Sequence, residues 1–258
     1  MKLSLQSSIV KWIKAWCDAW CLLEGPELEP RICHSHFLTA YHSGRALSSL
    51  GGCLQGKVID IGAGTGHGAR YLNPSTTEYI PTDLPSGRSA LDSSISRLSH
   101  EPVLHCSIYE LPFETASFDG ALLLNVLEHL ARPSDGLKEL SRVLHPGSLV
   151  LFCVPFAFPL HGLPDDYRRW TARGLHCELE SAGFEILDLR SCGSTFASLA
   201  ININFCLRYE LRALVVLMPL LILTQCILNV LALVAERFFP QATALPLIYA
   251  GLARKKAI

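Results

Sequence analysis

Charged side chains are scarce in this 258-residue chain, because Asp, Glu, Lys and Arg together make up only 17% of it. Their signs nearly cancel to a formal net charge of −1, and no basic run is longer than Arg254-Lys255-Lys256. Proteins that bind nucleic acid need an extended basic surface, so we expect no nucleic-acid partner. Half of the residues are apolar, which is typical of one large packed domain or of a domain with an appendage.

The sequence also lacks the patterns that would give its ten cysteines a structural role. No CxxC pair occurs, and no His or Cys partners follow at zinc spacing, so we expect no metal site. The first residues, MKLSLQSSIVKWIKAWC, have neither the clean apolar core nor the small-residue cleavage site of a secretory signal. We therefore interpret the cysteines as reduced thiols and expect a cytoplasmic protein.

Short apolar runs alternate with helical patterns between residues 57 and 189. Strands are predicted over 57–61, 78–82, 103–106, 118–124, 149–154 and 185–189, with a last strand over 246–254. Helices are predicted from the glycine turn after the first strand to about Leu72, over 133–144 and over 171–182. This alternation predicts an α/β protein with a mostly parallel sheet and helices on both faces.

The first 50 residues are predicted to be helical. Trp12, Trp16 and Trp20 recur at helical spacing, and we interpret them as a packing face rather than a ligand site. A second helix is predicted from Phe37 to Leu50.

One glycine-rich turn carries the clearest chemical signal. VIDIGAGTG at 58–66 predicts a strand, a tight turn and a helix start, where glycines permit positive φ and close approach of a ligand. Asp60 precedes the turn in a strand that would otherwise be apolar, where an acid is costly. Asp83 ends the next strand, where an acid can accept both ribose hydroxyls of a nucleoside. A nicotinamide site remains open on spacing alone, because Gly68 lies nearby.

In its motifs the chain resembles the class I S-adenosylmethionine-dependent methyltransferases, especially the type 11 group, over about residues 55–190. The resemblance rests on VIDIGAGTG, on TDLP at 82–85, on LPFETASFDGALLLNVLEHL at 111–130 and on LKELSRVLHPGSLVLFCVP at 137–155. It implies a Rossmann-like fold with a mostly parallel seven-stranded sheet and helices on both faces. With the patterns outside it, we predict an N-terminal helical cap at 1–50, the cofactor-binding core at 51–200, an apolar helical insertion before the last strand at 201–240, and the closing strand with a basic tail at 241–258.

The resemblance also implies S-adenosylmethionine as the cofactor and suggests its contacts. Asp60 and the backbone of the turn would hold the methionine portion, Asp83 the ribose, and Leu84 the adenine. Asn125 would lie by the sulfonium with Val126 behind it. Family members often have an Asp where this chain has Ser107, so the adenine amino group is expected to meet a hydroxyl or the backbone of the next residue. The predicted cofactor-binding residues are Asp60, Gly62, Ala63, Gly64, Gly66, Asp83, Leu84, Ser107, Ile108, Asn125 and Val126.

The segment 155–170, PFAFPLHGLPDDYRRW, follows the predicted fifth strand, at the edge where open α/β sheets bind ligands. We predict that it binds the methyl acceptor, with His161 as general base, an Asp orienting it, and Arg168 or Arg169 holding an anionic group. The alternative is a solvated loop with a structural Trp. A similar pattern followed by TARGL at 171–175 occurs in type 11 proteins that resemble polysaccharide and glycolipid methyltransferases. The predicted catalytic residues are His161, Asp165, Tyr167 and Arg168.

Other histidines give weaker signals. His129 is interpreted as a structural or cofactor-side residue rather than the base. His34, His36, Tyr41 and His42 form a cluster that could cap the acceptor pocket or serve no function at all.

One uncharged apolar run, ALVVLMPLLILTQCILNVLALVA from Ala213 to Ala235, is long enough to suggest a membrane segment. A closing strand after it requires the chain to return to its starting side, which disfavours a single span. Pro219 interrupts the run and arginines flank it, so we favour a monotopic helix or re-entrant hairpin in the cytoplasmic leaflet. The alternatives are a helix pair buried against the rest of the protein or a second subunit, and a true span.

Together these features predict an enzyme that O-methylates a glycan, a glycolipid or a lipid-linked intermediate, in the cytoplasm and on the inner face of the cell membrane. A quinone-type small-molecule methyltransferase, a non-catalytic binding protein that keeps the fold, and a dehydrogenase are the alternatives. The sequence does not indicate the oligomeric state.

Overall fold

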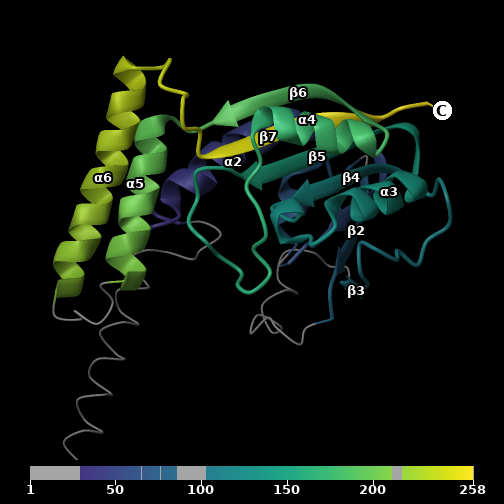
Figure 1. Ribbon diagram of the computed structural model, residues 1–258, viewed down its shortest axis with the longest axis horizontal. Helices are drawn as coiled ribbons and strands as arrows, with labels where there is room; N and C mark the ends of the chain where they lie inside the picture. The colour runs from purple at the N-terminus through teal and green to yellow at the C-terminus, as the bar shows by residue number, and fades with distance from the viewer. Residues whose placement is uncertain (1–29, 65, 76, 86–102, 211–216, 258) are drawn as a thin grey trace, which may run out of the picture. The chain divides into compact units, whose positions relative to one another are not determined.

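The computed structural model describes residues 30–64, 66–75, 77–85, 103–210 and 217–257 (Figure 1). It divides into two compact units, one formed by Met1–His42 with Gly193–Leu247 and the other by Ser43–Cys192 with Ile248–Ile258. Helix α2 (Phe37–Gly51) forms where it was predicted, and its residues belong in part to each unit. The predicted helix with the three tryptophans lies outside the described residues.

A seven-stranded sheet forms the second unit, in the order β3-β2-β1-β4-β5-β7-β6. Six strands run parallel and β7 runs antiparallel between β5 and β6, which confirms the predicted sheet and its closing strand. The strands are β1 (Gly56–Ile61), β2 (Thr77–Asp83), β3 (Leu104–His105), β4 (Phe118–Leu124), β5 (Leu144–Pro155), β6 (Phe184–Cys192) and β7 (Ile248–Lys255).

The central strands are apolar because they are buried on both faces. Phe118, Leu122 and Phe152 are fully buried. Ile61 of β1 lies opposite Leu123 of β4 and Thr82 of β2, so the carboxyl ends of these strands meet at one edge of the sheet. That edge is where the predicted site residues gather.

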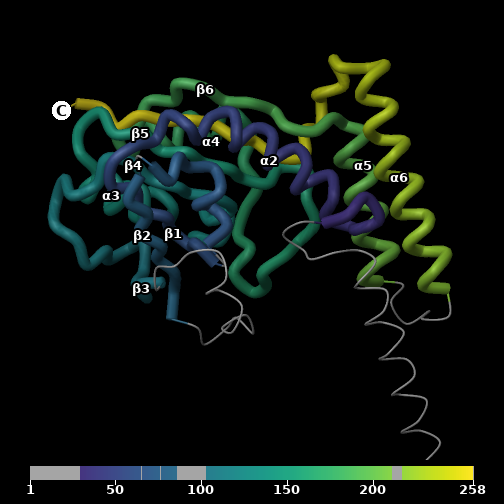
Figure 2. The backbone as a smooth tube through the Cα atoms, turned by 180° about the vertical axis from the view of Figure 1, so that it is seen from behind, coloured from purple at the N-terminus to yellow at the C-terminus, as the bar shows by residue number. Residues whose placement is uncertain are grey.

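Helices cover both faces of the sheet. The helices α3 (Pro133–Val143) and α4 (Ala172–Ser181) lie on one face, and the part of α2 in this unit lies on the other (Figures 1 and 2). Proline in the first turn starts α3, and the Thr171 hydroxyl caps α4 by accepting a hydrogen bond from the Gly174 amide at 3.1 Å. On the α2 side, a Cβ at Gly51 would collide with the backbone of Tyr71, which shows how closely the chain packs there.

Two predicted elements differ from the structure. The helix expected after the glycine turn is only a 3-10 segment, η1 (His67–Tyr71), because glycines in this stretch have low helix propensity and Asn73-Pro74 ends it. Strand β5 begins at Leu144 rather than at residue 149. Its pairing with β4 shifts register there, and Gly147 at φ 85° permits the irregularity.

The first unit contains an antiparallel helix pair. Figures 1 and 2 both show α5 (Thr195–Phe205) beside α6 (Met218–Phe238), and a π-helical turn (Cys206–Glu210) follows α5. Pro219, which was expected to interrupt the apolar run, lies in the first turn of α6, where its missing N–H costs no hydrogen bond. Asn229 ties the pair together, since its side-chain amide donates to the Ile32 and His34 carbonyls and accepts from Asn204.

Helix α6 combines a buried side with an exposed apolar side. Of the helices that the structure describes, it is the one long and apolar enough to cross a membrane by length and composition, and a third of its most apolar window is buried. Large apolar side chains recur at helical spacing on its exposed side: Leu220, Leu223, Ile227, Val230, Leu231, Val234 and Phe238. We call these seven residues the outer face of α6.

Candidate functional site

The glycine turn after β1 has the backbone that its sequence predicts. Gly62, Gly64 and Gly66 all have positive φ, at 66°, 54° and 75°. The Ala63 amide donates to the Thr82 carbonyl at 2.9 Å, which fixes the turn against the end of β2. A Cβ at Gly62 would lie 2.7 Å from Val126, whereas one at Gly64 would meet no atom within 4 Å. The turn is therefore packed on the β4 side and open at Gly64.

Asp60 lies beneath this turn. Its side chain is 2% exposed and accepts a hydrogen bond from the Tyr79 hydroxyl at 2.6 Å. Burial raises the pKa of Asp60 to about 7, the nearby Asp83 adds to the rise, and the Tyr79 hydrogen bond opposes it. A Cβ at Gly68 would collide with this carboxylate, so the extra glycine that left the spacing ambiguous has a packing role.

Asp83 holds the turn from β2. One carboxylate oxygen accepts from the Gly64 amide at 2.9 Å and the other from the Leu84 amide at 2.7 Å. A carboxylate has about four acceptor sites, so lone pairs remain for two ribose hydroxyls. The Leu84 side chain is 62% exposed and available to an adenine ring.

The predicted adenine end lies next to Asp83. Strand β3 pairs with the end of β2, and the Cys106 amide donates to the Asp83 carbonyl at 2.8 Å. The Ser107 hydroxyl accepts a hydrogen bond from the Tyr109 amide at 3.2 Å. Ile108 points into the core, so only its backbone can serve the cofactor.

Asn125 ends β4 in a left-handed conformation with φ 55°, which Asn adopts more readily than most residues. Its amide donates to the Cys153 carbonyl of β5 at 2.8 Å, and the next residue, Val126, packs on Gly62. The structure therefore brings the residues predicted to bind the cofactor to one edge of the sheet.

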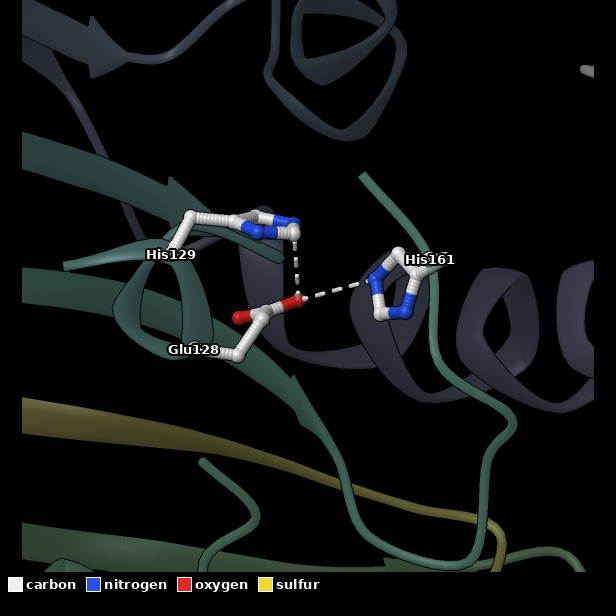
Figure 3. Close-up of side chains that lie close together, drawn as sticks. All are labelled: Glu128, His129 and His161. Carbon is white, nitrogen blue, oxygen red and sulfur yellow. Dashed lines mark ion pairs between the residues drawn. The ribbon is translucent and has the colours of Figure 1, made fainter. Parts of the chain in front are cut away.

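Three further side chains, those of Glu128, His129 and His161, lie close together (Figure 3). Glu128 lies in the 3-10 turn η3 (Leu127–His129) and is 0% exposed. One of its carboxylate oxygens is 3.8 Å from Nε2 of His129 and 3.7 Å from Nε2 of His161. Among the residues that the structure describes, neither oxygen of Glu128 has a hydrogen-bond partner. The sequence analysis missed Glu128, although an acid inside LLLNVLEHL was a signal like that of Asp60.

A buried ion pair positions His161. The Arg169 guanidinium donates to both oxygens of Asp166, at 2.5 and 2.8 Å, and lowers the pKa of this carboxyl to about 2. Asp166 in turn accepts a hydrogen bond from the His161 amide at 2.9 Å. Burial lowers the pKa of His161, but Glu128, the Pro159 carbonyl and Asp166 outweigh it, so the net pKa is raised.

Asp165, Tyr167 and Arg168 hold the loop against η3 instead of joining the three-residue group. The Asp165 carbonyl accepts a hydrogen bond from Nδ1 of His129 at 2.7 Å, and its carboxylate accepts from the Tyr167 hydroxyl at 3.1 Å. The Tyr167 amide donates to the Glu128 carbonyl at 2.9 Å, and Arg168 donates to the Ala131 carbonyl at 3.0 Å. The aspartate beside His161 is thus Asp166, while Asp165 lies beside His129. The residues at 34, 36, 41 and 42 belong to the other compact unit.

Comparison with known proteins matches part of this sequence to one family. Residues 59–152 match the family described as "Methyltransferase domain". The chain is 31% identical over 100 residues to a demethylmenaquinone methyltransferase of Clavibacter sepedonicus, covering 38% of this chain and 40% of the relative. It is 30% identical over 144 residues to a protein of Mycolicibacterium smegmatis named as a probable S-adenosylmethionine-dependent methyltransferase. This match covers 53% of this chain and 54% of the relative.

Over residues 59–152 the chain carries a methyltransferase domain. The fold of this domain also matches solved structures, among them that of the [4+2]-cyclase SpnF, with a TM-score of 0.55, 21% identity, and coverage of 85% of this chain and 82% of that one. At this identity the likeness shows the fold alone. The chain spans about half the length or less of the curated relatives it matches.

Proposed function

We propose that the protein transfers the methyl group of S-adenosylmethionine to an oxygen of an acceptor bound beside Glu128, His129 and His161. One observation carries the proposal. Val126 packs on Gly62 of the glycine turn, and the buried Glu128 follows it by only two residues. A cofactor on the turn and an acceptor at the three-residue group would therefore meet within one short segment of chain, at the edge where open α/β sheets bind ligands.

Methyl transfer from a sulfonium is an in-line displacement. The acceptor oxygen forms a bond to the methyl carbon, the carbon–sulfur bond breaks, the cofactor leaves as a neutral thioether, and the hydroxyl proton is lost. The protein orients the cofactor and the acceptor. It also supplies a group that removes the hydroxyl proton or lowers the pKa of the hydroxyl. Glu128, His129 and His161 are side chains of this kind, and they follow Asn125, the residue proposed to lie by the sulfonium, closely in the chain or pack against the same turn.

For the acceptor we propose a hydroxyl on a glycan, a glycolipid or a lipid-linked intermediate, methylated in the cytoplasm at the inner face of the cell membrane. The outer face of α6 supports an acceptor held in a membrane, because a contiguous exposed apolar patch marks an interaction site. A quinone-type acceptor is the second candidate, supported by the relative named as a demethylmenaquinone methyltransferase.

Methyl-labelled cofactor incubated with the full chain and a fractionated membrane lipid extract tests this function. We expect the label in the glycolipid or lipid-linked glycan fraction, and label in the quinone fraction would support the second candidate. Asp83→Asn should weaken cofactor binding at least tenfold in calorimetry, because the carboxylate holds both the turn and the predicted ribose. Asp135→Asn, which alters an exposed acid on α3, is the matched control.

Two results would overturn the proposal. If wild-type protein binds no S-adenosylmethionine and Asp83→Asn makes no difference, the domain is a non-catalytic scaffold. If it binds a nicotinamide dinucleotide instead, it is a dehydrogenase.

A further inference from the structure

We propose that Glu128, His129 and His161 bind a divalent transition metal ion of the zinc class. The three side chains offer one carboxylate oxygen and two imidazole nitrogens, all within 4.8 Å of one another. Two histidines and a glutamate are a known ligand set of catalytic zinc, with the fourth position open to water or substrate. The binding of the ion is independent of the proposed function, whereas the role of the ion toward the acceptor rests on the proposed function.

The distances between the Glu128 oxygen and the two histidine nitrogens suit a bridging metal ion better than direct hydrogen bonds. The Glu128 oxygen lies 3.7 and 3.8 Å from the two Nε2 atoms. A charge-assisted hydrogen bond would draw such atoms to about 2.8 Å. Two ligands that each lie about 2.1 Å from a tetrahedral ion are about 3.4 Å apart. The observed separations need only a small closure around such an ion.

The other ring nitrogen of each histidine is already occupied. Nδ1 of His129 faces the Asp165 carbonyl at 2.7 Å, and because a carbonyl can only accept, Nδ1 carries the hydrogen. Nε2 of the neutral ring then presents a lone pair to Glu128. Orientation of a histidine by a backbone carbonyl at its second nitrogen is the usual outer shell of a metal site.

His161 has the same arrangement. Its Nδ1 lies 3.2 Å from the Pro159 carbonyl and 3.3 Å from the terminal NH2 of Arg169. Both hydrogens of that NH2 group are used by the Pro159 carbonyl and by Asp166, at 2.9 and 2.8 Å. Nδ1 of His161 therefore donates to Pro159, and its Nε2 also presents a lone pair to Glu128.

Two nitrogen lone pairs and one oxygen of the buried Glu128 carboxylate therefore face one another. Both oxygens of Glu128 lack hydrogen-bond partners in the described part of the chain, although a buried unpaired carboxylate is expensive. A metal ion compensates this charge at once. Both histidine side chains are 29% exposed, so the side of the ion away from Glu128 would be open to an acceptor.

At that open position the ion would coordinate the acceptor hydroxyl and lower its pKa. The proton leaves to solvent, the oxygen attacks the methyl carbon, and the ion itself is unchanged. His161 then acts as a metal ligand in place of the general base predicted from the sequence.

The test uses the full chain stripped with a chelator and titrated with Zn²⁺ alone. We expect one tightly bound equivalent after dialysis, measured by elemental analysis, and a metal-dependent rise in Tm. Glu128→Gln and His161→Asn should each weaken binding by more than about 100-fold, since loss of an outer-shell partner alone typically costs 10–100-fold. Co²⁺ in the same protein should give d–d bands without a thiolate charge-transfer band, which excludes binding at cysteines.

His145→Asn is the matched control. It makes the same chemical change at a histidine that also faces a carboxylate, Asp119 at 4.0 Å, but is half exposed and lies outside the cluster. It should bind Zn²⁺ as the wild type does. Glu128→Gln keeps the side-chain shape and removes a buried charge, so its metal-free Tm should equal or exceed that of the wild type, which shows that it folds.

Wild-type protein that binds no Zn²⁺, or Glu128→Gln and His161→Asn variants that bind it like the wild type, would overturn the inference. Calorimetry with S-adenosylmethionine in the presence of the chelator separates this result from failure of the proposed function. Cofactor binding without metal binding would contradict the metal site alone. Metal binding without cofactor binding would contradict the proposed methyltransferase function.

Discussion

At the scale of single residues, three buried carboxylates of the methyltransferase domain are accommodated in different ways. Asp166 is paired with Arg169, and its pKa falls. Asp60 has a neutral hydroxyl as its partner, and its pKa rises. Glu128 accepts no hydrogen bond within the described part of the chain, and its neighbours are two histidine nitrogens at 3.7 and 3.8 Å. A carboxylate buried in this way is expected where a ligand completes the structure, and this is why the metal proposal centres on Glu128.

Asp60 gives a prediction about pH. Its folded pKa of about 7 is above the ordinary value of 3.8, so the folded state holds the proton more tightly than the unfolded state. This contribution to stability is present below about pH 4 and is lost as pH rises through 7. Asp60→Asn removes it, so the stability of the wild type relative to the variant should fall by about 2.5 kcal/mol between pH 5 and pH 8.

Urea unfolding of both proteins at the two pH values measures this change. Asp135→Asn, at an exposed position, should show no such divergence from the wild type. If the Asp60→Asn and wild-type stabilities stay parallel from pH 5 to pH 8, Asp60 is ionised throughout and the argument from burial is wrong.

The sequence could predict residues whose role depends on local spacing. The glycines of the turn and Asp83 lie where the motif implies, because a turn between a strand and a helix is set by neighbours along the chain. Glu128 gains its role from a contact with His161, 33 positions away, and only the folded loop shows which of the adjacent acids Asp165 and Asp166 faces His161. For that reason sequence analysis chose Asp165 rather than Asp166.

At the scale of elements, the strands were easier to predict than the segments that join them. Buried parallel strands are continuous apolar runs, so β4 lies where it was expected, at Phe118–Leu124. The irregular start of β5 depends on pairing with β4, which no local pattern records. The packing role of Gly68 against Asp60 is another contact between separate elements that no local pattern records.

The helix pair of the first unit gives a prediction at this scale. Asn229 of α6 is buried and bonds to the buried Asn204 of α5, to the His34 carbonyl in a buried contact and to the Ile32 carbonyl in a part-buried one. Asn229→Leu breaks these three hydrogen bonds and leaves their partners unsatisfied, so we expect this unit to lose about 3 kcal/mol of stability. Hydrogen exchange of α5 and α6 amides measures the loss.

Asn202→Leu on α5 is the matched control, because that side chain is exposed and its amide donates to the Ser198 carbonyl of the same helix at 2.8 Å. It should change protection by less than about 0.5 kcal/mol. Equal protection in the Asn229→Leu and Asn202→Leu variants would show that the buried amide does not hold the pair.

At the scale of the whole molecule, one chain combines a methyltransferase domain with a helix pair whose outer face is apolar. The sequence showed the apolar run but not which side of it is buried, because Gln225 and Asn229 face inward together with Leu221 and Ile222, while other leucines face outward. An exposed side this apolar is unusual for a soluble helix, whose polar side normally faces water. It fits a helix that lies in a membrane interface on one side and packs on protein on the other.

Flotation with anionic phospholipid vesicles tests this membrane contact. We expect the wild type to float with the vesicles, and Leu220→Glu, Leu223→Glu and Leu231→Glu combined to stay in the dense fraction. Each buried leucine contributes about 2 kcal/mol, so the three together should reduce partitioning by more than 100-fold. The control is Leu163→Glu with Leu187→Glu, two exposed leucines of the other unit, which should float normally.

The response to carbonate distinguishes the ways in which α6 could meet a bilayer. A helix embedded in one leaflet by its outer face should remain with carbonate-washed membranes, and the triple variant should not. Wild-type protein that is wholly soluble after the wash, and that fails to float, would show that the outer face of α6 packs on protein. The acceptor would then have to reach the methyltransferase domain through solution, and a soluble small molecule would replace the lipid-linked acceptor as the substrate to test.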